Sequence, residues 1–281
     1  MKKVRSKILV VILALVLAFS LTALCACGET SGNGNSDGGN DTTADTTVNV
    51  SGGVSDTVTV PDSADMFTDA DKTPSYDAAT AVTIALSGST ATASSEAVTV
   101  EDGKVIISSP GSYVVSGSGR NVTIVVDLPA NSTEKVRLAL SGVTITNDDF
   151  AAVYVKSADK VFVILEGENS LEVTGDFVAI DDNKVDGAVF SKDNIVFQGN
   201  GSLTIASSKH GIVGKDDVKI TGGTITVNAA NHGIEANDSV RIAVATVNIT
   251  SGKDGIHVEN TSDSTKGYFY MESGYLKITT V

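Results

Sequence analysis

Short runs of alternating apolar and polar residues recur at nearly constant spacing between Asp186 and Val281. Four similar tripeptides open four successive units, with glycines 24, 22 and 22 residues apart: Asp186-Gly187-Ala188, His210-Gly211-Ile212, His232-Gly233-Ile234 and Asp254-Gly255-Ile256. Each unit contains two strand-like alternations, and this combination is typical of stacked repeats. One unit is too small to bury its own apolar face, so its neighbours must cover it. We therefore expect one coil of a parallel β-helix per unit.

The region before the clear repeats is also predicted to be all-β. Short apolar alternations separated by Gly, Ser, Asn and Pro continue from residue 81 to 145. We expect residues 79–146 to form N-terminal cap strands and residues 147–281 to form the repeat coils, because an open coil end leaves unpaired strand edges. A separate small sandwich is the alternative. Residues 174–185 and 260–266 are insertions, which wall a binding groove or act as simple spacers.

The first 27 residues have the pattern of a secretory signal. Lys2, Lys3 and Arg5 precede an apolar run that is short for a membrane span of ~20 residues. The segment Leu24-Cys25-Ala26-Cys27 resembles a bacterial lipobox, which predicts a lipidated Cys27 at the mature N-terminus. A retained transmembrane helix, or modification of Cys25, is the alternative. Residues 28–78 are polar and are expected to form a disordered tether. The protein is thus predicted to be extracellular and lipid-anchored at the cell membrane.

The acidic charge balance limits the possible partners. The chain carries a net charge of −14, and the leader contributes basic residues but no acids. Such a surface repels nucleic acid and suits divalent cations. Both cysteines lie in the leader, so we expect neither a disulfide nor thiol chemistry. We expect membrane contact only through the lipid, and the oligomeric state is left open.

One predicted column of side chains is acidic. Asp159, Asp193, Asp216 and Asp238 each stand two residues before the first strand of a unit, and Asp217 adjoins the third. Coils stack about 4.8 Å apart, so these carboxylates repel unless they are hydrogen-bonded or bridged by a cation. Closure of the local turn by each Asp is one interpretation. A Ca²⁺ site is the other, because Ca²⁺ takes six to eight oxygen ligands.

A second predicted column precedes the repeated glycine and mixes acids with histidines. It contains Asp186, His210, His232 and Asp254, and His257 and Glu235 follow closely. A mixed column of this kind can bind a transition metal or change charge near pH ~6.5. Polar side chains that only line the turn are the alternative. We attribute the glycines to a backbone conformation that other residues do not adopt.

These columns give two sets of candidate residues. The candidate metal ligands are Asp186, Asp193, Asp216, Asp217, Asp238 and Asp254. The candidate carbohydrate-binding residues are His210, His232, Glu235, His257, Tyr268 and Tyr270. The chain has no Trp, so any aromatic platform for a sugar must use Tyr, although Tyr on strands more often packs in a core. No nucleophile motif and no phosphate-binding loop is present.

The sequence resembles a family of bacterial surface carbohydrate-binding proteins over residues 80–281. The stretches that carry the resemblance are Ala152–Phe162, Asp186–Asp193, Gly211–Val227 and Lys266–Tyr270. It implies a right-handed, single-stranded parallel β-helix similar to polysaccharide lyases, which binds cellulose-like or acidic pectic sugars with Ca²⁺ and without established cleavage. The motifs carry metal-ligand roles over to Asp193, Asp216, Asp186 and Asp254. His210 and His232 depart from the family pattern, where Asp is more usual.

We therefore expect a lipid-anchored protein that binds polysaccharide with the help of Ca²⁺ and without catalysis. A polysaccharide lyase or hydrolase on the same scaffold is one alternative, with Lys192 or Lys215 as the base. A purely structural surface adhesin or spacer is the other.

Overall fold

The computed structural model describes residues 62–281, and these are almost entirely β-structure. The predicted signal peptide (1–27), its Cys27 and the first part of the predicted tether (28–61) lie outside the described residues. No helix within the described part is long and apolar enough to cross a membrane.

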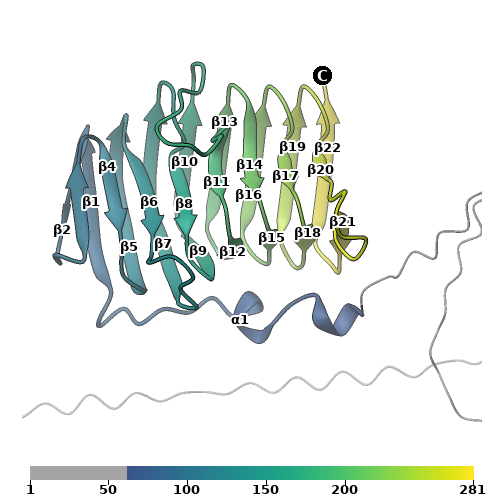
Figure 1. The fold of residues 1–281 in the computed structure, drawn as a ribbon, viewed down its shortest axis with the longest axis horizontal. Coiled ribbons are helices and arrows are strands. Elements are labelled where there is room, and N and C mark those ends of the chain that lie inside the picture. Colours follow the sequence, from purple (N-terminus) through teal and green to yellow (C-terminus); the bar gives the residue numbers. More distant parts are fainter. Residues whose placement is uncertain (1–61) are drawn as a thin grey trace, which may run out of the picture. The chain divides into compact units, whose positions relative to one another are not determined.

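From Val153 onward the chain repeats a cycle of three strands, and equivalent strands of successive cycles pair in parallel (Figure 1). The first face of the coil consists of β8 (Val153–Ser157), β11 (Gly187–Ser191), β14 (His210–Gly214), β17 (Ile234–Ala236) and β20 (Ile256–Val258). The second face consists of β9 (Lys160–Glu166), β12 (Asn194–Gly199), β15 (Asp217–Ile220), β18 (Ser239–Ile242) and β21 (Tyr268–Met271). The third face consists of β10 (Glu168–Val173), β13 (Ser202–Ser207), β16 (Thr224–Ala229), β19 (Thr246–Ser251) and β22 (Tyr275–Thr280). The predicted stacked, parallel, β-helix-like architecture is confirmed.

The core is a set of apolar columns inside this coil. Ile195, Val218 and Val240 occupy paired positions on β12, β15 and β18, and all three are fully buried. Burial of every second residue follows from the pleat, since alternate side chains point to opposite faces of a strand. Phe269 and Ile278 of the last coil are 43% and 42% exposed, because only one neighbouring coil covers them.

Parallel stacking begins earlier than predicted. The strands concerned are β1 (Val82–Gly88), β2 (Thr90–Ala93), β3 (Val98–Glu101), β4 (Lys104–Ile107), β5 (Gly111–Arg120), β6 (Thr123–Asp127) and β7 (Lys135–Asn147). Only β1/β2 and β3/β4 are antiparallel, whereas β4, β6 and β8 stack in parallel, as do β5, β7 and β9. The boundary at residue 147 is therefore wrong as the start of the coils. These strands lack the Gly-Ile marker that made the later repeats visible.

The tether prediction is also wrong for its last part. Residues 62–77, which we call the N-terminal strap, include η1 (Ser63–Asp65) and α1 (Asp69–Lys72) and run across the coils (Figure 1). The strap packs on the second face, where the Met66 side chain is 2% exposed and Arg241 donates a 2.9 Å hydrogen bond to the Met66 carbonyl oxygen. Thr68 and Asp71 form a reciprocal capping box that starts α1.

A buried carboxylate holds the strap in place. Asp71 is fully buried and accepts 2.8 Å hydrogen bonds from Lys160 and Lys219 on separate coils. Burial alone would raise the pKa of Asp71, but the hydrogen bonds from these two lysines outweigh it and lower the pKa to about 2. Burial in turn lowers the pKa of Lys219, an effect that Asp71 opposes. Two cations from the coil therefore meet one anion from the strap.

The repeated glycines are required by close packing. Gly211 and Gly233 have no left-handed backbone conformation. A Cβ on Gly211 would clash with Val227 Cγ1 and lie 2.5 Å from the Gly233 oxygen, and a Cβ on Gly233 would lie 2.6 Å from the Gly255 oxygen. Our backbone explanation is wrong for this column, although it holds for Gly199 (φ 105°). The coils approach so closely at this corner that no side chain fits.

Replacing Asp71 with Asn should lower the free energy of unfolding by about 3 kcal/mol, because it leaves two buried lysines without their counter-charge. Asp69→Asn in the same helix is the matched control, since Asp69 is exposed. Urea unfolding of both variants measures the difference. Equal stability of the two would show that Asp71 does not hold the strap.

Acidification should release the strap in a defined pH window. The stabilisation from Asp71 is fully present above its unfolded-state pKa near 3.8 and is lost as the pH falls through about 2. Limited proteolysis of the strap between pH 5 and pH 2 should therefore accelerate below roughly pH 4 in the wild type. The Asp71→Asn variant should be cleaved readily across the whole range.

Gly211→Ala should destabilise the coil by about 1–3 kcal/mol, because the added methyl group overpacks a closed corner. Thermal unfolding measures the loss. An unchanged melting temperature would contradict the close-packing explanation.

Candidate functional site

The first insertion is anchored over the first face. The Tyr154 hydroxyl donates a 2.8 Å hydrogen bond to Asp181 and accepts one of 2.7 Å from the Asn183 side chain. Burial, followed by the hydrogen bond to Asp181, raises the pKa of Tyr154. Phe190 and Val185 pack around the same aromatic ring in a small apolar cluster outside the main core. The loop is thereby held in a defined position.

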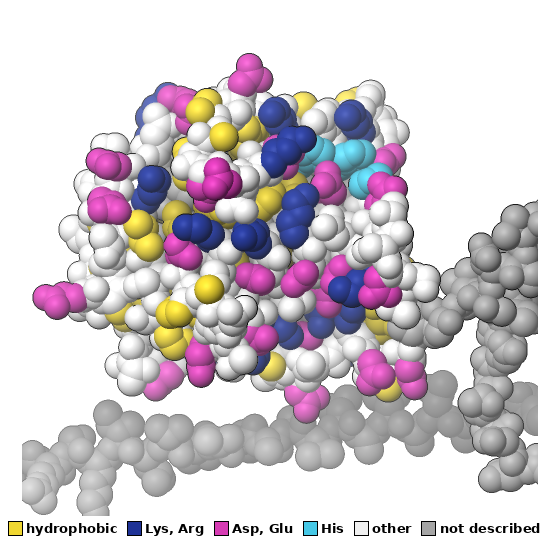
Figure 2. Space-filling model, viewed as in Figure 1, with side chains coloured by type: hydrophobic (Ala, Val, Ile, Leu, Met, Phe, Trp, Pro, Cys, Tyr) yellow, Lys and Arg dark blue, Asp and Glu magenta, His cyan; other side chains and the backbone are white. Residues whose placement is uncertain are grey.

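A cavity of about 410 Å³ lies between this insertion and the first face. Its lining is almost entirely polar and consists of Asp182, Asn183, Lys184, Asp186, Phe190, Lys192, His210, Lys215 and Glu235. The prediction that an insertion walls a groove is confirmed for residues 174–185. Figure 2 shows Lys and Arg side chains gathered on this side of the molecule, next to the three histidines.

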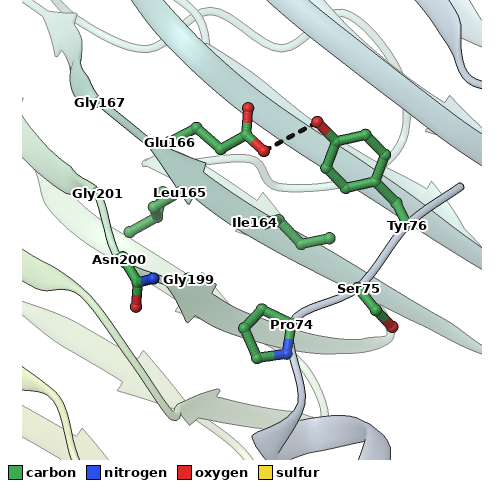
Figure 3. A pocket seen from close by; sticks show the side chains of 10 residues that line it. All are labelled: Pro74, Ser75, Tyr76, Ile164, Leu165, Glu166, Gly167, Gly199, Asn200 and Gly201. Carbon is green, nitrogen blue, oxygen red and sulfur yellow. Dashed lines mark hydrogen bonds between the residues drawn. The ribbon is translucent and has the colours of Figure 1, made fainter. Parts of the chain in front are cut away.

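A second cavity, of about 620 Å³, lies where the strap leaves the coil (Figure 3). Its polar lining residues are Ser75, Tyr76, Glu166 and Asn200, and apolar side chains and three glycines complete it. The Tyr76 hydroxyl donates a 2.9 Å hydrogen bond to Glu166, which is the one charged side chain in the lining. Since that carboxylate is already bonded, this cavity offers a ligand fewer free polar groups. The cavity under the insertion is the stronger candidate.

The three histidines form one continuous stack at the edge of the first face. His210 and His232 each stand two residues before the paired positions Ile212 and Ile234, and their ring centroids lie 5.1 Å apart at an interplanar angle of 22°. His257 continues the stack at 4.5 Å and 23°. Two carboxylates lie alongside: Glu235 is 3.3 Å from His210 Nδ1, and Asp254 is 3.3 Å from His232 Nδ1 and 3.1 Å from His257 Nδ1. The prediction that these residues share one edge is confirmed.

Burial favours the neutral form of the His210 and His232 imidazoles. Burial is the largest cause that lowers the pKa of His210, although Glu235 and Asp186 oppose it. Burial, followed by the neighbouring His257, lowers the pKa of His232. Each ring therefore keeps one nitrogen lone pair available to accept a hydrogen bond or to bind a metal.

The acidic column is also aligned as predicted, but its members have different partners. Asp159 pairs with Lys135 at 2.9 Å, and Asp193 accepts a 2.9 Å hydrogen bond from the Ala158 backbone N–H. Asp238 pairs with Lys266 at 2.7 Å. Asp193 therefore bonds the turn of the preceding coil, 35 residues away, and does not close its own turn.

Asp216 lies in the middle of this column. Burial, followed by the charges of Asp238 and Asp193, raises the pKa of Asp216. Its carboxylate has no ion pair or side-chain hydrogen bond among the residues that the structure describes. The charge of Lys266 acts on Asp216, but Asp216 lacks the direct ion pair that Asp159 and Asp238 have.

The structure does not bring the six candidate metal ligands into one place. Asp193, Asp216 and Asp238 follow the ends of first-face strands, whereas Asp186 and Asp254 precede their beginnings. Asp217 turns away and pairs with Arg241 at 3.2 Å. Within the described chain, two groups of three metal-ligating side chains have their ligand atoms within 4.8 Å of one another. They are His210, His232, Glu235 and His232, Asp254, His257.

Asp186 is not in register with the other members of its predicted column. Gly187, not Asp186, pairs with His210, because this coil is longer than the two that follow. Asp186 nevertheless lines the cavity beside His210. Asp186 is therefore part of the site because it lines the cavity, although it is not aligned with the histidine stack.

The two tyrosines lie on a different face from the histidines. The Arg241 guanidinium lies 5.4 Å from the Tyr268 ring centroid, and the Tyr268 hydroxyl is 3.6 Å from the sulfur of Met66 in the strap. Tyr270 packs near Phe67 of the strap, with centroids 6.2 Å apart. The structure thus places neither Tyr268 nor Tyr270 with His210 and Glu235, because the strap occupies the second face.

Five polar residues of the cavity lining were not predicted from the sequence to contact a ligand. Lys184, Asp182 and Asn183 belong to the insertion, and Lys192 and Lys215 were considered only as bases for catalysis. The recurring Lys-Asp pairs at 192–193 and 215–216 were the available signal. In each pair the lysine lines the cavity, while the aspartate belongs to the acidic column.

Comparison with known proteins gives consistent matches. The family model of the carbohydrate-binding domain-containing proteins matches residues 101–281. A relative from Acetivibrio thermocellus, described as a carbohydrate-binding domain-containing protein, is 46% identical over 188 residues. The alignment covers 65% of this chain and 65% of the relative, so the chain spans just under two thirds of the relative's length.

A solved structure has a similar fold. It is described as that of the polysaccharide lyase-like protein from C. thermocellum, in a gadolinium derivative. The TM-score is 0.66 at 37% sequence identity, over 70% of this chain and 82% of that chain. The expected family is confirmed by both kinds of comparison: the chain belongs to the carbohydrate-binding domain-containing proteins.

Proposed function

We propose that this protein binds an acidic polysaccharide in the cavity between the first insertion and the first face. The observation that carries the proposal is the lining of that cavity. Lys184 and Lys192 are exposed there without an ion-pair partner in the described chain, although the protein as a whole is strongly acidic. Free ammonium groups attract sugar carboxylates, and the neighbouring carboxylates and amide can bind sugar hydroxyls.

The shape of the coil suits a polymer. Apart from the insertion residues, the lining groups lie on or beside β11, β14 and β17, so they extend along the coil axis in steps of about 4.8 Å. A linear polysaccharide lying along this axis would meet a similar edge at each coil. Family membership supports a carbohydrate ligand, and the lysines favour an acidic one.

We propose Ca²⁺ as a bridge at the neighbouring corner. Asp216 has no direct ion pair among the described residues and is flanked by Asp193 and Asp238. A hard cation at Asp216 would relieve the repulsion and leave coordination positions for oxygen atoms of the sugar. Lipid attachment at Cys27, which lies outside the described residues, would place this binding domain at the cell surface.

A lyase is the second candidate function. Lys192 and Lys215 line one cavity with His210, and a basic side chain beside a bound uronate is the arrangement that proton abstraction needs. Lyase action on polygalacturonate would increase the absorbance of unsaturated products, whereas the binding proposal expects no increase.

Binding should depend on the cavity lysines. In affinity electrophoresis through polygalacturonate, Lys192→Ala should reduce the retardation of the protein severalfold, because one of the two free cations is lost. Lys277→Ala is the matched control, since it removes an equal charge from the exposed third face. If the wild type migrates equally with and without the polymer and with neutral glucans, the protein is a structural surface spacer.

Calcium dependence should disappear with Asp216. EDTA should weaken the retardation of the wild type, and Asp216→Asn should bind weakly with or without EDTA. Equal EDTA sensitivity of the variant and the wild type would exclude Asp216 as the calcium ligand.

A further inference from the structure

We propose that the histidine stack binds a divalent transition-metal ion of the Zn²⁺ type through His210, His232 and Glu235. His210 comes from one coil, and His232 and Glu235 come from the next. Their ligand atoms all lie within 4.8 Å of one another. The stack borders the cavity but is separate from the acidic column to which calcium was assigned above. The inference therefore goes beyond carbohydrate binding and does not depend on it.

The stack contains two unsatisfied buried nitrogen atoms. Nδ1 of His210 and Nδ1 of His232 are shielded from solvent and have no hydrogen-bond partner. The His210 residue is 8% exposed. Leaving a buried polar atom without a partner is destabilising, because its desolvation is not offset. A bound metal ion would satisfy such an atom without requiring the geometry of a hydrogen bond.

The distances to the carboxylates fit metal coordination. Glu235 Oε2 lies 3.3 Å from His210 Nδ1, yet the pair lacks hydrogen-bond geometry. Two ligands held at ~2.0–2.1 Å from a tetrahedral ion are themselves about 3.3 Å apart. The oxygen and the nitrogen are thus spaced like neighbouring ligands of one ion.

The ligand types select the metal. Two of the three ligands are imidazoles, which suit Zn²⁺, Cu²⁺ or Ni²⁺, whereas Ca²⁺ takes oxygen ligands. Three protein ligands leave a fourth tetrahedral position open. Because His210 and Glu235 both line the cavity, that position is accessible from the groove.

Neighbouring groups favour this triad over the alternative one. Lys215 Nζ lies 3.3 Å from Glu235 Oε1, so it orients the carboxylate and leaves Oε2 facing His210. In the outer group, His257 Nδ1 already has a 3.1 Å contact with hydrogen-bond geometry to Asp254, whose side chain is 60% exposed. Two cations limit the affinity for a metal ion without blocking the site: Lys215, and Lys253, which lies near His210 and His232.

Isothermal titration calorimetry tests the site. ZnCl₂ is titrated into the purified, chelator-treated full chain at pH 7 without sugar. We expect one ion per chain. His210→Ala and Glu235→Gln should each weaken binding by about tenfold or more, as expected for the loss of a ligand. Glu168→Gln, an exposed carboxylate-to-amide change on the third face, should leave it unchanged. Excess Ca²⁺ should not displace Zn²⁺.

Two results would overturn the assignment. The first is no saturable binding by the wild type, or equal binding by His210→Ala and Glu235→Gln when circular dichroism shows them folded. The second is a His257→Ala variant that loses binding while His210→Ala keeps it, which would place the ion in the outer group. A Co²⁺-loaded wild type should show the visible absorption of a tetrahedral site, and Glu235→Gln should change that spectrum. Because no polysaccharide is present, failure here is distinguishable from failure of the carbohydrate proposal.

Discussion

Parallel hydrogen bonding between successive coils is the constraint on which the rest of this structure depends. It places residues that are 22 or 23 positions apart in direct register, as for Ile195, Val218 and Val240. Each apolar column gains burial only when its neighbours are in place, so stability accumulates along the stack. A slip of one residue would turn every core side chain outward. The columns outside the coil are fixed by the same register.

Stacking also forces like residues together on the outside. A column of aspartates accumulates charge, and the protein offsets it coil by coil, with Lys135 beside Asp159 and Lys266 beside Asp238. Asp216 lacks such a partner. Histidines behave differently in the same geometry, because their planar rings can stack on one another at close to the coil spacing. The stack is not a simple register column, because His257 on β20 pairs in register with Glu235.

The faces of the coil have different environments. On the second face, Lys160 and Lys219 are covered by the N-terminal strap, and buried Asp71 balances them. The first face carries an anchored insertion instead, and a polar cavity remains beside it. Because the strap covers the second face, the first face is the one where acidic, basic and imidazole side chains line an accessible cavity. The separation explains why the tyrosines and the histidines do not form one site.

The sequence by itself determined the repeat period, the inward residues and most members of the two outer columns, because these follow from local alternation and spacing. It could also indicate that residues 174–185 wall a groove. Only the tertiary structure decided that the strap is ordered, since Asp71 meets lysines 89 and 148 residues away and its segment has the composition of a tether. Only the structure moved Asp186 out of its column, because a longer coil changes the pairing by one residue. Periodicity specifies which residues are neighbours within a repeat, whereas contacts between the repeat and a non-repeating segment have no local signal.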